Sequence, residues 1–221
     1  MSASILEKAS YLIALILSLS VHEWAHAFVS YRLGDDTAKN YGRLTLNPLA
    51  HIDPIGTLLF PILAAVTGVP LFGWAKPVPV NVLKLRSPRI GHSMVAAAGP
   101  LSNLLIAFFS ILIVYVIKKY TNSSMLSDDI QYGFLMNIMG ALILINCILA
   151  LFNLLPIPPL DGGAVLGGLL PVKVSRLMDR FIAPYGMFIL ILLIMTDSLA
   201  WMYGTAVWLI GLMRQLVSAL I

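Results

Sequence analysis

The chain has 221 residues, of which 59% are hydrophobic and only 11% are charged. A soluble domain of this length could not cover so much apolar surface, so the composition excludes an ordinary soluble protein and indicates a polytopic membrane protein in contact with the lipid bilayer. The net charge of +4 fits basic loops that face an anionic membrane leaflet, and it requires no nucleic acid as a partner.

The apolar segments predict an all-α polytopic membrane protein with about five to six transmembrane helices. The first span runs from Tyr11 to about Tyr31, and further spans are expected at His92–Val116 and Tyr132–Leu155. Residues from about 181 to 221 are apolar with a break near Asp197, and they predict a C-terminal helical hairpin. Because no long polar stretch separates these segments, we expect residues 1–221 to form a single membrane-embedded domain with its core at about 10–165.

Three other stretches have patterns that do not fit a straight helix. GRLTLNP (42–48) alternates apolar and polar residues as a strand does, and PVPVNV (77–82) contains too many prolines for a helix. These two predict short strand-like elements. The apolar segment Ile55–Phe72 contains Pro61, Gly68 and Pro70, which suit a re-entrant segment that enters the membrane and returns to the same side.

The end of the first span contains the motif H-E-W-A-H, with His22, Glu23 and His26. Residues four apart lie on one face of a helix, so the two imidazoles can bind one Zn²⁺ ion. The adjacent glutamate can then accept a proton from a water molecule that attacks a carbonyl group. The alternative is a pair of histidines without a metal, but ionisable side chains within a membrane segment are rare and usually functional.

A catalytic zinc ion requires a third protein ligand and an open fourth position. The other histidines, His51 and His92, lie near the borders between loops and membrane segments, whereas Asp161 stands between apolar runs in N-L-L-P-I-P-P-L-D-G-G. The prolines of this stretch end a helix, and Gly162 and Gly163 allow the backbone to approach a partner closely. A helix-capping role is the alternative for Asp161.

These two motifs resemble the signature of the site-2 protease family of intramembrane zinc metalloproteases. GRLTLNPLAHIDPIGT, GWAKPVPVN and AAGPLSN are similar to motifs of its compact prokaryotic branch, and the resemblance extends from about Val21 to Gly163. Many family members carry a PDZ domain between core helices. Only the stretch Tyr120–Gln131 lies at that place here, so we expect no PDZ domain.

The resemblance also implies roles for individual residues. His22, His26 and Asp161 would bind one zinc ion per chain, and Glu23 would be the catalytic base. Asn153 matches the family asparagine that contacts the substrate backbone, and Asn103 in GPLSN matches a further family position that we also assign to substrate binding.

The positions of the basic residues favour a re-entrant rather than a crossing segment at Ile55–Phe72. With a re-entrant segment only Lys8, Lys118 and Lys119 oppose the other loop cations, whereas a crossing segment divides the same cations more evenly. The positive-inside rule then predicts a multi-pass protein of the cell membrane whose N-terminus is extracytoplasmic and whose motifs and strand-like elements lie toward the cytoplasmic side. The larger group is Arg32, Lys39, Arg43, Lys76, Lys84, Arg86, Arg89, Lys173, Arg176 and Arg180.

Three functions are compatible with a metal-binding membrane protein. The first is a metalloprotease that hydrolyses peptide bonds within or near transmembrane segments of other membrane proteins, as in regulated intramembrane proteolysis. A metal transporter would have metal-capable residues at several depths, whereas this sequence concentrates them at one. An inactive scaffold that binds membrane proteins would be expected to have lost Glu23 or a metal ligand, and none is lost here. The sequence therefore favours the protease.

Overall fold

The regular structure is helical, as predicted, and the residues that the structure describes contain no β-strand. The computed structural model describes residues 3–67, 73–120 and 130–221, so most of the predicted polar turn Tyr120–Gln131 lies outside the described residues. In chain order the elements are α1 (Ala3–Arg32), α2 (Thr37–Asn40), η1 (Pro48–Ala50), the π-helical η2 (Pro54–Leu59), α3 (Phe60–Thr67), η3 (Val82–Lys84), α4 (Pro88–Tyr120), α6 (Ile130–Asn153), α7 (Asp161–Leu169), α8 (Val172–Phe181), η4 (Ala183–Tyr185), α9 (Gly186–Met195) and α10 (Trp201–Leu220).

Within the described residues, four stretches are long and apolar enough to cross a membrane: Ile5–Arg32, Pro88–Tyr120, Ile130–Asn153 and Val172–Met195. The chain is therefore a multi-pass membrane protein. The sequence predicted about five to six spans. The difference arises because α3 has only 8 residues and because α10 carries Arg214 and Gln215, which shorten its apolar run.

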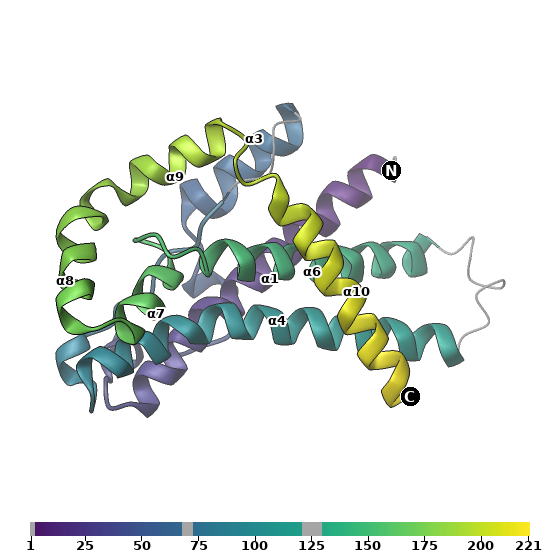
Figure 1. Ribbon diagram of the computed structural model, residues 1–221. Coiled ribbons are helices and arrows are strands. Elements are labelled where there is room, and N and C mark those ends of the chain that lie inside the picture. The colour runs from purple at the N-terminus through teal and green to yellow at the C-terminus, as the bar shows by residue number, and fades with distance from the viewer. Residues whose placement is uncertain (1–2, 68–72, 121–129) are drawn as a thin grey trace.

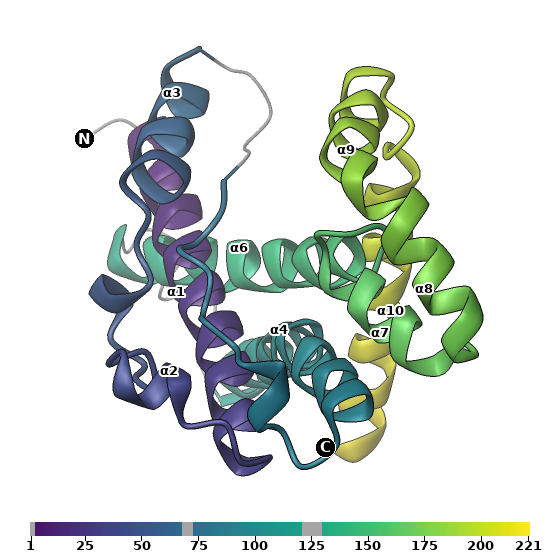
Figure 2. The same ribbon diagram turned by 90° about the vertical axis from the view of Figure 1, so that its left-hand side faces the viewer.

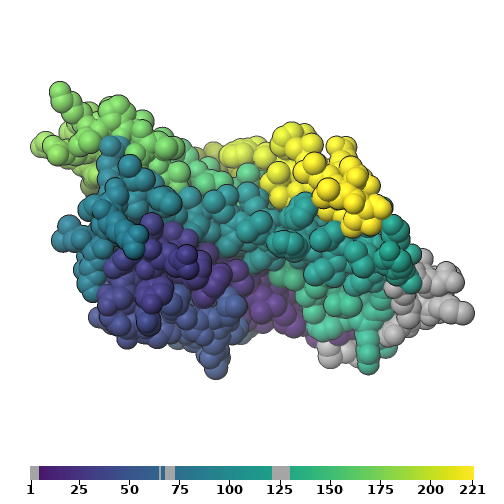
Figure 3. Space-filling view, turned by 90° about the horizontal axis from the view of Figure 1, so that it is seen from below, coloured from purple at the N-terminus to yellow at the C-terminus, as the bar shows by residue number. Residues whose placement is uncertain are grey.

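Helices α1, α4 and α6 form a bundle that the other elements surround (Figure 1). Helix α10 crosses the flank of this bundle, and Figure 3 shows it on the outside of α4. Small buried side chains, among them Ala107, Cys147 and Ala206, lie in the cluster that joins α4, α6 and α10. Such small residues let helix backbones approach closely, which strengthens the van der Waals packing between helices in lipid.

Most of the basic residues lie on elements that gather at one end of the bundle (Figure 1). The C-terminal end of α1, α2, the start of α4, α7 and α8 meet there, and we call this the basic end. Lys118 and Lys119 lie in the last turn of α4, at the opposite end. Elements that carry cations of the larger group defined in the sequence analysis thus lie close together in space.

Residues 54–67 leave the basic end through η2 and α3, and residues 73–81 return to it (Figure 2); we call these two limbs the hairpin. The two limbs are joined by hydrogen bonds at their base. The Lys76 N–H donates to His51 O at 2.9 Å, and the Thr57 hydroxyl donates to Trp74 O at 2.8 Å. His51 and Lys76, which flank the predicted re-entrant segment, therefore lie side by side.

The predicted strand-like elements are not strands in the described residues, and the reason differs between the two. Residues 44–45 form a bend, and residues 46–47 have no regular structure before η1. Residues 75–81 are extended, but their N–H groups do not pair with a neighbouring strand. Val78 N–H donates to the Glu23 carboxylate, and Asn81 N–H donates to the Asp35 carboxylate. Pro77 and Pro79 have no N–H to donate, so one edge of the segment cannot form a ladder.

Candidate metal centre

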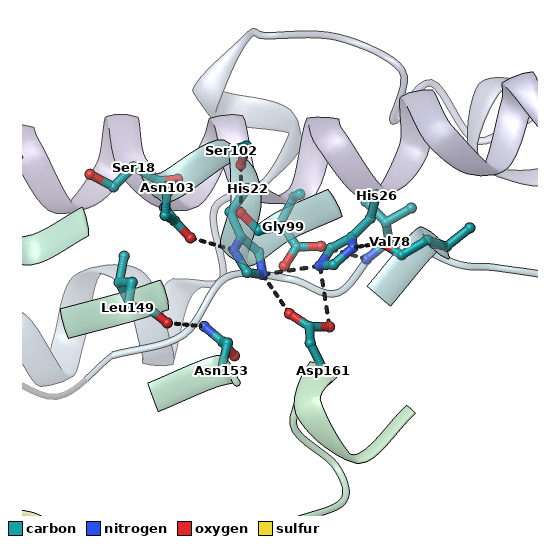
Figure 4. A network of polar contacts seen from close by, with 12 residues as sticks. Ser18, His22, His26, Val78, Gly99, Ser102, Asn103, Leu149, Asn153 and Asp161 are labelled. Carbon is teal, nitrogen blue, oxygen red and sulfur yellow. Dashed lines mark hydrogen bonds and ion pairs between the residues drawn. The ribbon is translucent and has the colours of Figure 1, made fainter. Parts of the chain in front are cut away.

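The two histidines of the H-E-x-x-H motif lie one turn apart on α1 and face the interior of the bundle. His22 is 5% exposed and His26 is 8% exposed. Their Nε2 atoms are 3.0 Å apart. The Asp161 carboxylate, at the start of α7, approaches both rings, at 3.2 Å from His22 Nε2 and 3.4 Å from His26 Nε2. Figure 4 shows the three side chains pointing toward one another.

The other nitrogen of each ring has an acceptor partner. His26 Nδ1 lies 2.7 Å from the Val95 carbonyl oxygen, and His22 Nδ1 lies 2.7 Å from Asn103 Oδ1. Since an oxygen of either kind can only accept, we assign the proton of each neutral ring to Nδ1. The Nε2 atoms then direct their lone pairs into the space between the rings and Asp161.

This donor set fits a metal cation. One ligand atom each from His22, His26 and Asp161 lies within 4.8 Å of the others, and all three atoms are acceptors. Acceptors that converge without a donor repel one another unless a cation lies between them. Within the described residues, the buried Asp161 Oδ2 has no hydrogen-bond donor. Two imidazoles and one carboxylate are the protein ligands of one common class of catalytic zinc site, which leaves the fourth position open.

Gly99 of α4 allows the two imidazole rings to lie this close to α4. A Cβ atom at this position would lie 2.5 Å from His22 Cε1 and 2.6 Å from His26 Cε1, which is closer than real side-chain contacts come. The absence of a side chain here therefore creates the space for the metal centre. This is a close approach of the kind that favours glycine.

A break between α6 and α7 positions Asp161. Helix α6 ends at Asn153, a turn follows, and α7 begins at Asp161, which confirms that the prolines of this stretch end the helix. A Cβ atom at Gly162 would overlap the carbonyl groups of Leu154 and Leu155, and one at Gly163 would lie 2.8 Å from Pro158 N. The two glycines thus let α7 fold back onto the turn, which directs the aspartate at the histidines.

The Glu23 carboxylate is held by the hairpin and not by α4 or α7. Its Oε2 accepts a hydrogen bond of 2.8 Å from the Val78 N–H, in the sequence Pro77-Val78-Pro79. Arg43, which is buried, donates from its guanidinium to the Lys76 carbonyl and so fixes the same limb. Burial lowers the pKa of the Arg43 guanidinium, and the nearby negative charge of Glu23 acts in the opposite direction.

The two predicted substrate-binding asparagines lie in different surroundings. Asn153, the last residue of α6, donates from Nδ2 to Leu149 O at 3.0 Å and is partly buried (Figure 4). Asn103 is fully buried, and its amide contacts His22, Asn146 and Ser18. Its polar atoms are thereby occupied within the protein, so this conformation favours a role in orienting His22 rather than the predicted contact with substrate.

The supporting roles of four residues were not predicted from the sequence. Asn146 and Ser18 extend the contacts of Asn103, while Val78 and Arg43 support Glu23. Asn146 had a usable signal, because it is a polar residue in the apolar run LILINCILALF. Val78 had none, since it acts through its backbone.

Comparisons with known proteins agree with this site. The family model of "Peptidase family M50" matches residues 117–196, which include Asn153 and Asp161. YwhC of Bacillus subtilis is 41% identical over 184 residues, covering 83% of this chain and 79% of that protein. Rip2 of Mycolicibacterium smegmatis is 32% identical over 212 residues, covering 92% of this chain and 75% of that protein. Both carry the name "Putative zinc metalloprotease".

The membrane-spanning helices, the candidate metal centre and these relatives together place the chain in the class of membrane-embedded metallopeptidases. The chain belongs to peptidase family M50, the site-2 protease family, which confirms the resemblance seen in the sequence. No solved structure matches the chain.

Proposed function

We propose that this protein is an intramembrane zinc metalloprotease of the site-2 type, which hydrolyses peptide bonds within or near transmembrane segments of other membrane proteins. His22, His26 and Asp161 are the ligands of one zinc ion per chain, and Glu23 is the general base. The observation that carries this proposal is the convergence of three acceptor atoms within 4.8 Å: two come from α1, which also carries Glu23, and the third comes from α7.

The zinc ion, when bound, supplies a Lewis acid that polarises the scissile carbonyl group and lowers the pKa of water to about 7. Glu23 accepts the proton of the attacking water and passes it to the leaving amine. The Val78 N–H donates to one oxygen of Glu23 at 2.8 Å, so the carboxylate is already oriented before the reaction begins. Asn153 lies next to the turn that carries Asp161 and provides an amide for the substrate backbone.

A substrate helix must unwind locally before it can react. In an α-helix each carbonyl oxygen is hydrogen-bonded to the N–H four residues later and is shielded by side chains. Unwinding costs free energy in hydrocarbon, where freed backbone groups find no water. The reaction therefore takes place toward the end of the bundle where polar groups and water are available.

We further propose that the hairpin of residues 54–81 is the re-entrant segment and that the basic end faces the cytoplasm, with the N-terminus outside. The pairing of Lys76 with His51 and the clustering of cations support this topology. Reporter fusions at Asn40 and Ser87 should both report a cytoplasmic location, and a fusion within residues 121–129 an extracytoplasmic one. Opposite locations for Asn40 and Ser87 would mean that the hairpin crosses the membrane.

A metal transporter is the main competing function. It would need metal-capable side chains at several depths, and the described residues contain one such cluster, His22 with His26 and Asp161. The decisive experiment incubates the purified protein with a panel of single-pass membrane proteins from the same cell. Cleavage that a chelator abolishes and added zinc restores would support the protease. Zinc flux into vesicles without cleavage of any substrate would favour transport.

A further inference from the structure

Asn146 is a fully buried asparagine in the middle of the apolar span α6, at 0% exposure. A primary amide in this position loses its hydration, and the loss is recovered only where each polar atom finds a partner. None of the roles described above uses Asn146 directly. Its partners therefore indicate why the chain keeps an amide at this place.

Hydrogen bonds connect Asn146 to the metal centre through one other side chain. Asn103 Nδ2 donates to Asn146 Oδ1 at 2.7 Å, and His22 Nδ1 donates to Asn103 Oδ1 at 2.7 Å. Asn103 Nδ2 also lies 3.4 Å from the Ser18 carbonyl oxygen. Helices α6, α4 and α1 are thus joined by an uninterrupted series of buried contacts that ends on a proposed zinc ligand.

Backbone carbonyls fix the direction of this series. Asn146 Nδ2 donates to Leu142 O at 2.7 Å and to Ser18 Oγ at 2.7 Å. The Ser18 hydroxyl donates its own proton to Ala14 O at 2.6 Å, so it accepts from Asn146. If the Asn146 amide were reversed, its oxygen would face the Leu142 carbonyl, and two acceptors would oppose each other. The oxygen of Asn146 must therefore point at Asn103.

The same reasoning applies one step further along. A reversed Asn103 amide would present its oxygen to Asn146 Oδ1 and its NH₂ group to His22 Nδ1. His22 would then accept at Nδ1 and carry its proton on Nε2, the atom that faces Asp161. A protonated Nε2 has no lone pair for a metal. Asn146 Oδ1, together with the more distant Ser18 carbonyl oxygen, thus holds Asn103 in the orientation that gives His22 its metal-binding tautomer.

His26 differs from His22 in this respect. Its Nδ1 is bound directly by the Val95 carbonyl oxygen, which cannot rotate to present a donor. Only His22 depends on amide side chains for its tautomer, and amides can reverse.

We propose that Asn146 is a positioning residue of the metal centre: acting through Asn103, it holds His22 in the tautomer whose Nε2 lone pair faces the metal. This inference rests on the proposed zinc site. Removing partners that orient a metal ligand typically lowers metal affinity about 10–100-fold. We expect a loss of this size for Asn146→Leu, which keeps the branched shape of the side chain and removes its acceptor.

The test measures the affinity of purified full-length protein for Zn²⁺ by competition with a chelator. Asn137→Leu is the matched control, because Asn137 is an exposed asparagine on the same helix, and it should leave the affinity unchanged. Asn146→Ala removes the amide without steric conflict. Asn146→Asp, which is neutral in this buried place, keeps an acceptor for Asn103 and a hydroxyl donor for the Leu142 carbonyl. We expect Asn146→Asp to keep more affinity than either Asn146→Leu or Asn146→Ala.

A double-mutant cycle separates positioning from a general structural role. Once Asn103→Ala is in place, adding Asn146→Leu should cause no further loss of zinc affinity, because its effect passes through Asn103. Thermal unfolding in excess chelator reports the stability of the metal-free fold separately. Additive losses in the cycle, or a zinc affinity of Asn146→Leu and Asn146→Ala equal to that of Asn137→Leu, would overturn the inference. A wild-type protein that binds no zinc would instead remove the proposed function, and the inference with it.

Discussion

Two regions of the molecule hold neighbouring side chains of α1 in different ways. The bundle of α1, α4 and α6 holds His22 through buried side chains, with Asn103 and Asn146 fully enclosed. The hairpin of residues 54–81 holds Glu23 through one backbone N–H, that of Val78, in a segment without regular structure. Metal ligands need a fixed mutual geometry, which packed helices provide. A general base needs a fixed orientation and also access to water and substrate, which an extended segment at the edge of the bundle allows.

The comparison predicts that variants on the two sides fail differently. Changes on the bundle side should lower zinc affinity, and changes on the hairpin side should lower the rate of hydrolysis while zinc remains bound.

Glu23→Gln should have the largest effect on hydrolysis. Glutamine nearly keeps the volume of glutamate but cannot accept the proton, and removal of a general base typically costs about 10²–10⁴-fold in rate. Zinc content should remain that of wild type. Product formation and zinc are measured on the same sample, with the exposed Glu7→Gln as the control that should stay active. A zinc-loaded, active Glu23→Gln protein would refute the assignment of the base.

Asp161→Ala should weaken zinc binding most among the bundle-side variants. It removes a proposed ligand, so its loss of affinity should exceed the 10–100-fold that is typical of residues which only support a ligand. The control is Asp179→Ala, on the exposed face of α8. Undiminished affinity in chelator competition would exclude Asp161 from the site.

Gly99→Ala should disturb the same centre through sterics alone. The added methyl group would lie 2.5 Å from His22 Cε1, and overpacking of this kind typically costs about 1–3 kcal/mol. We expect zinc affinity to fall, whereas Gly140→Ala, where a Cβ meets nothing within 4 Å, should leave it unchanged. Equal affinities for the two variants would show that α4 can move away from the rings at little cost.

Arg43→Met should affect the hairpin side only. It removes the charged donor that binds the Lys76 carbonyl, an interaction class worth about 1.5–3 kcal/mol. We expect a lower rate of hydrolysis at unchanged zinc content, because the Val78 N–H is then less firmly positioned against Glu23. Arg86→Met, an exposed cation of the same end, is the control. A loss of zinc from Arg43→Met would mean that the two regions are not separate.

Asn153→Ala should have the smallest effect of the five. It leaves the metal ligands and the base in place and removes an amide for the substrate backbone, worth about 0.5–1.5 kcal/mol for a neutral hydrogen bond. Steady-state kinetics on a cleaved membrane protein should show the loss, with zinc content unchanged. Kinetics identical to wild type would remove Asn153 from substrate binding.

The local sequence pointed to the side chains that converge in the structure, but not to the residues that support them. His22, Glu23 and His26 share one helical turn, so their spacing alone implies a common face. Asp161 was found because prolines and glycines around it mark a break in an apolar run. The link between His22 and Asn146 depends on how three helices pack, and no periodicity encodes it. The strand prediction for 77–82 failed because Val78 N–H and Asn81 N–H bind carboxylates instead of a neighbouring strand.

The hydrogen bond between Lys76 and His51 also has a consequence for how this protein family can diversify. It closes the hairpin at its base, so the length of chain beyond it has little influence on where Val78 lies. We therefore expect relatives to differ more in the outer part of the hairpin than at its base, where Glu23 has its partner.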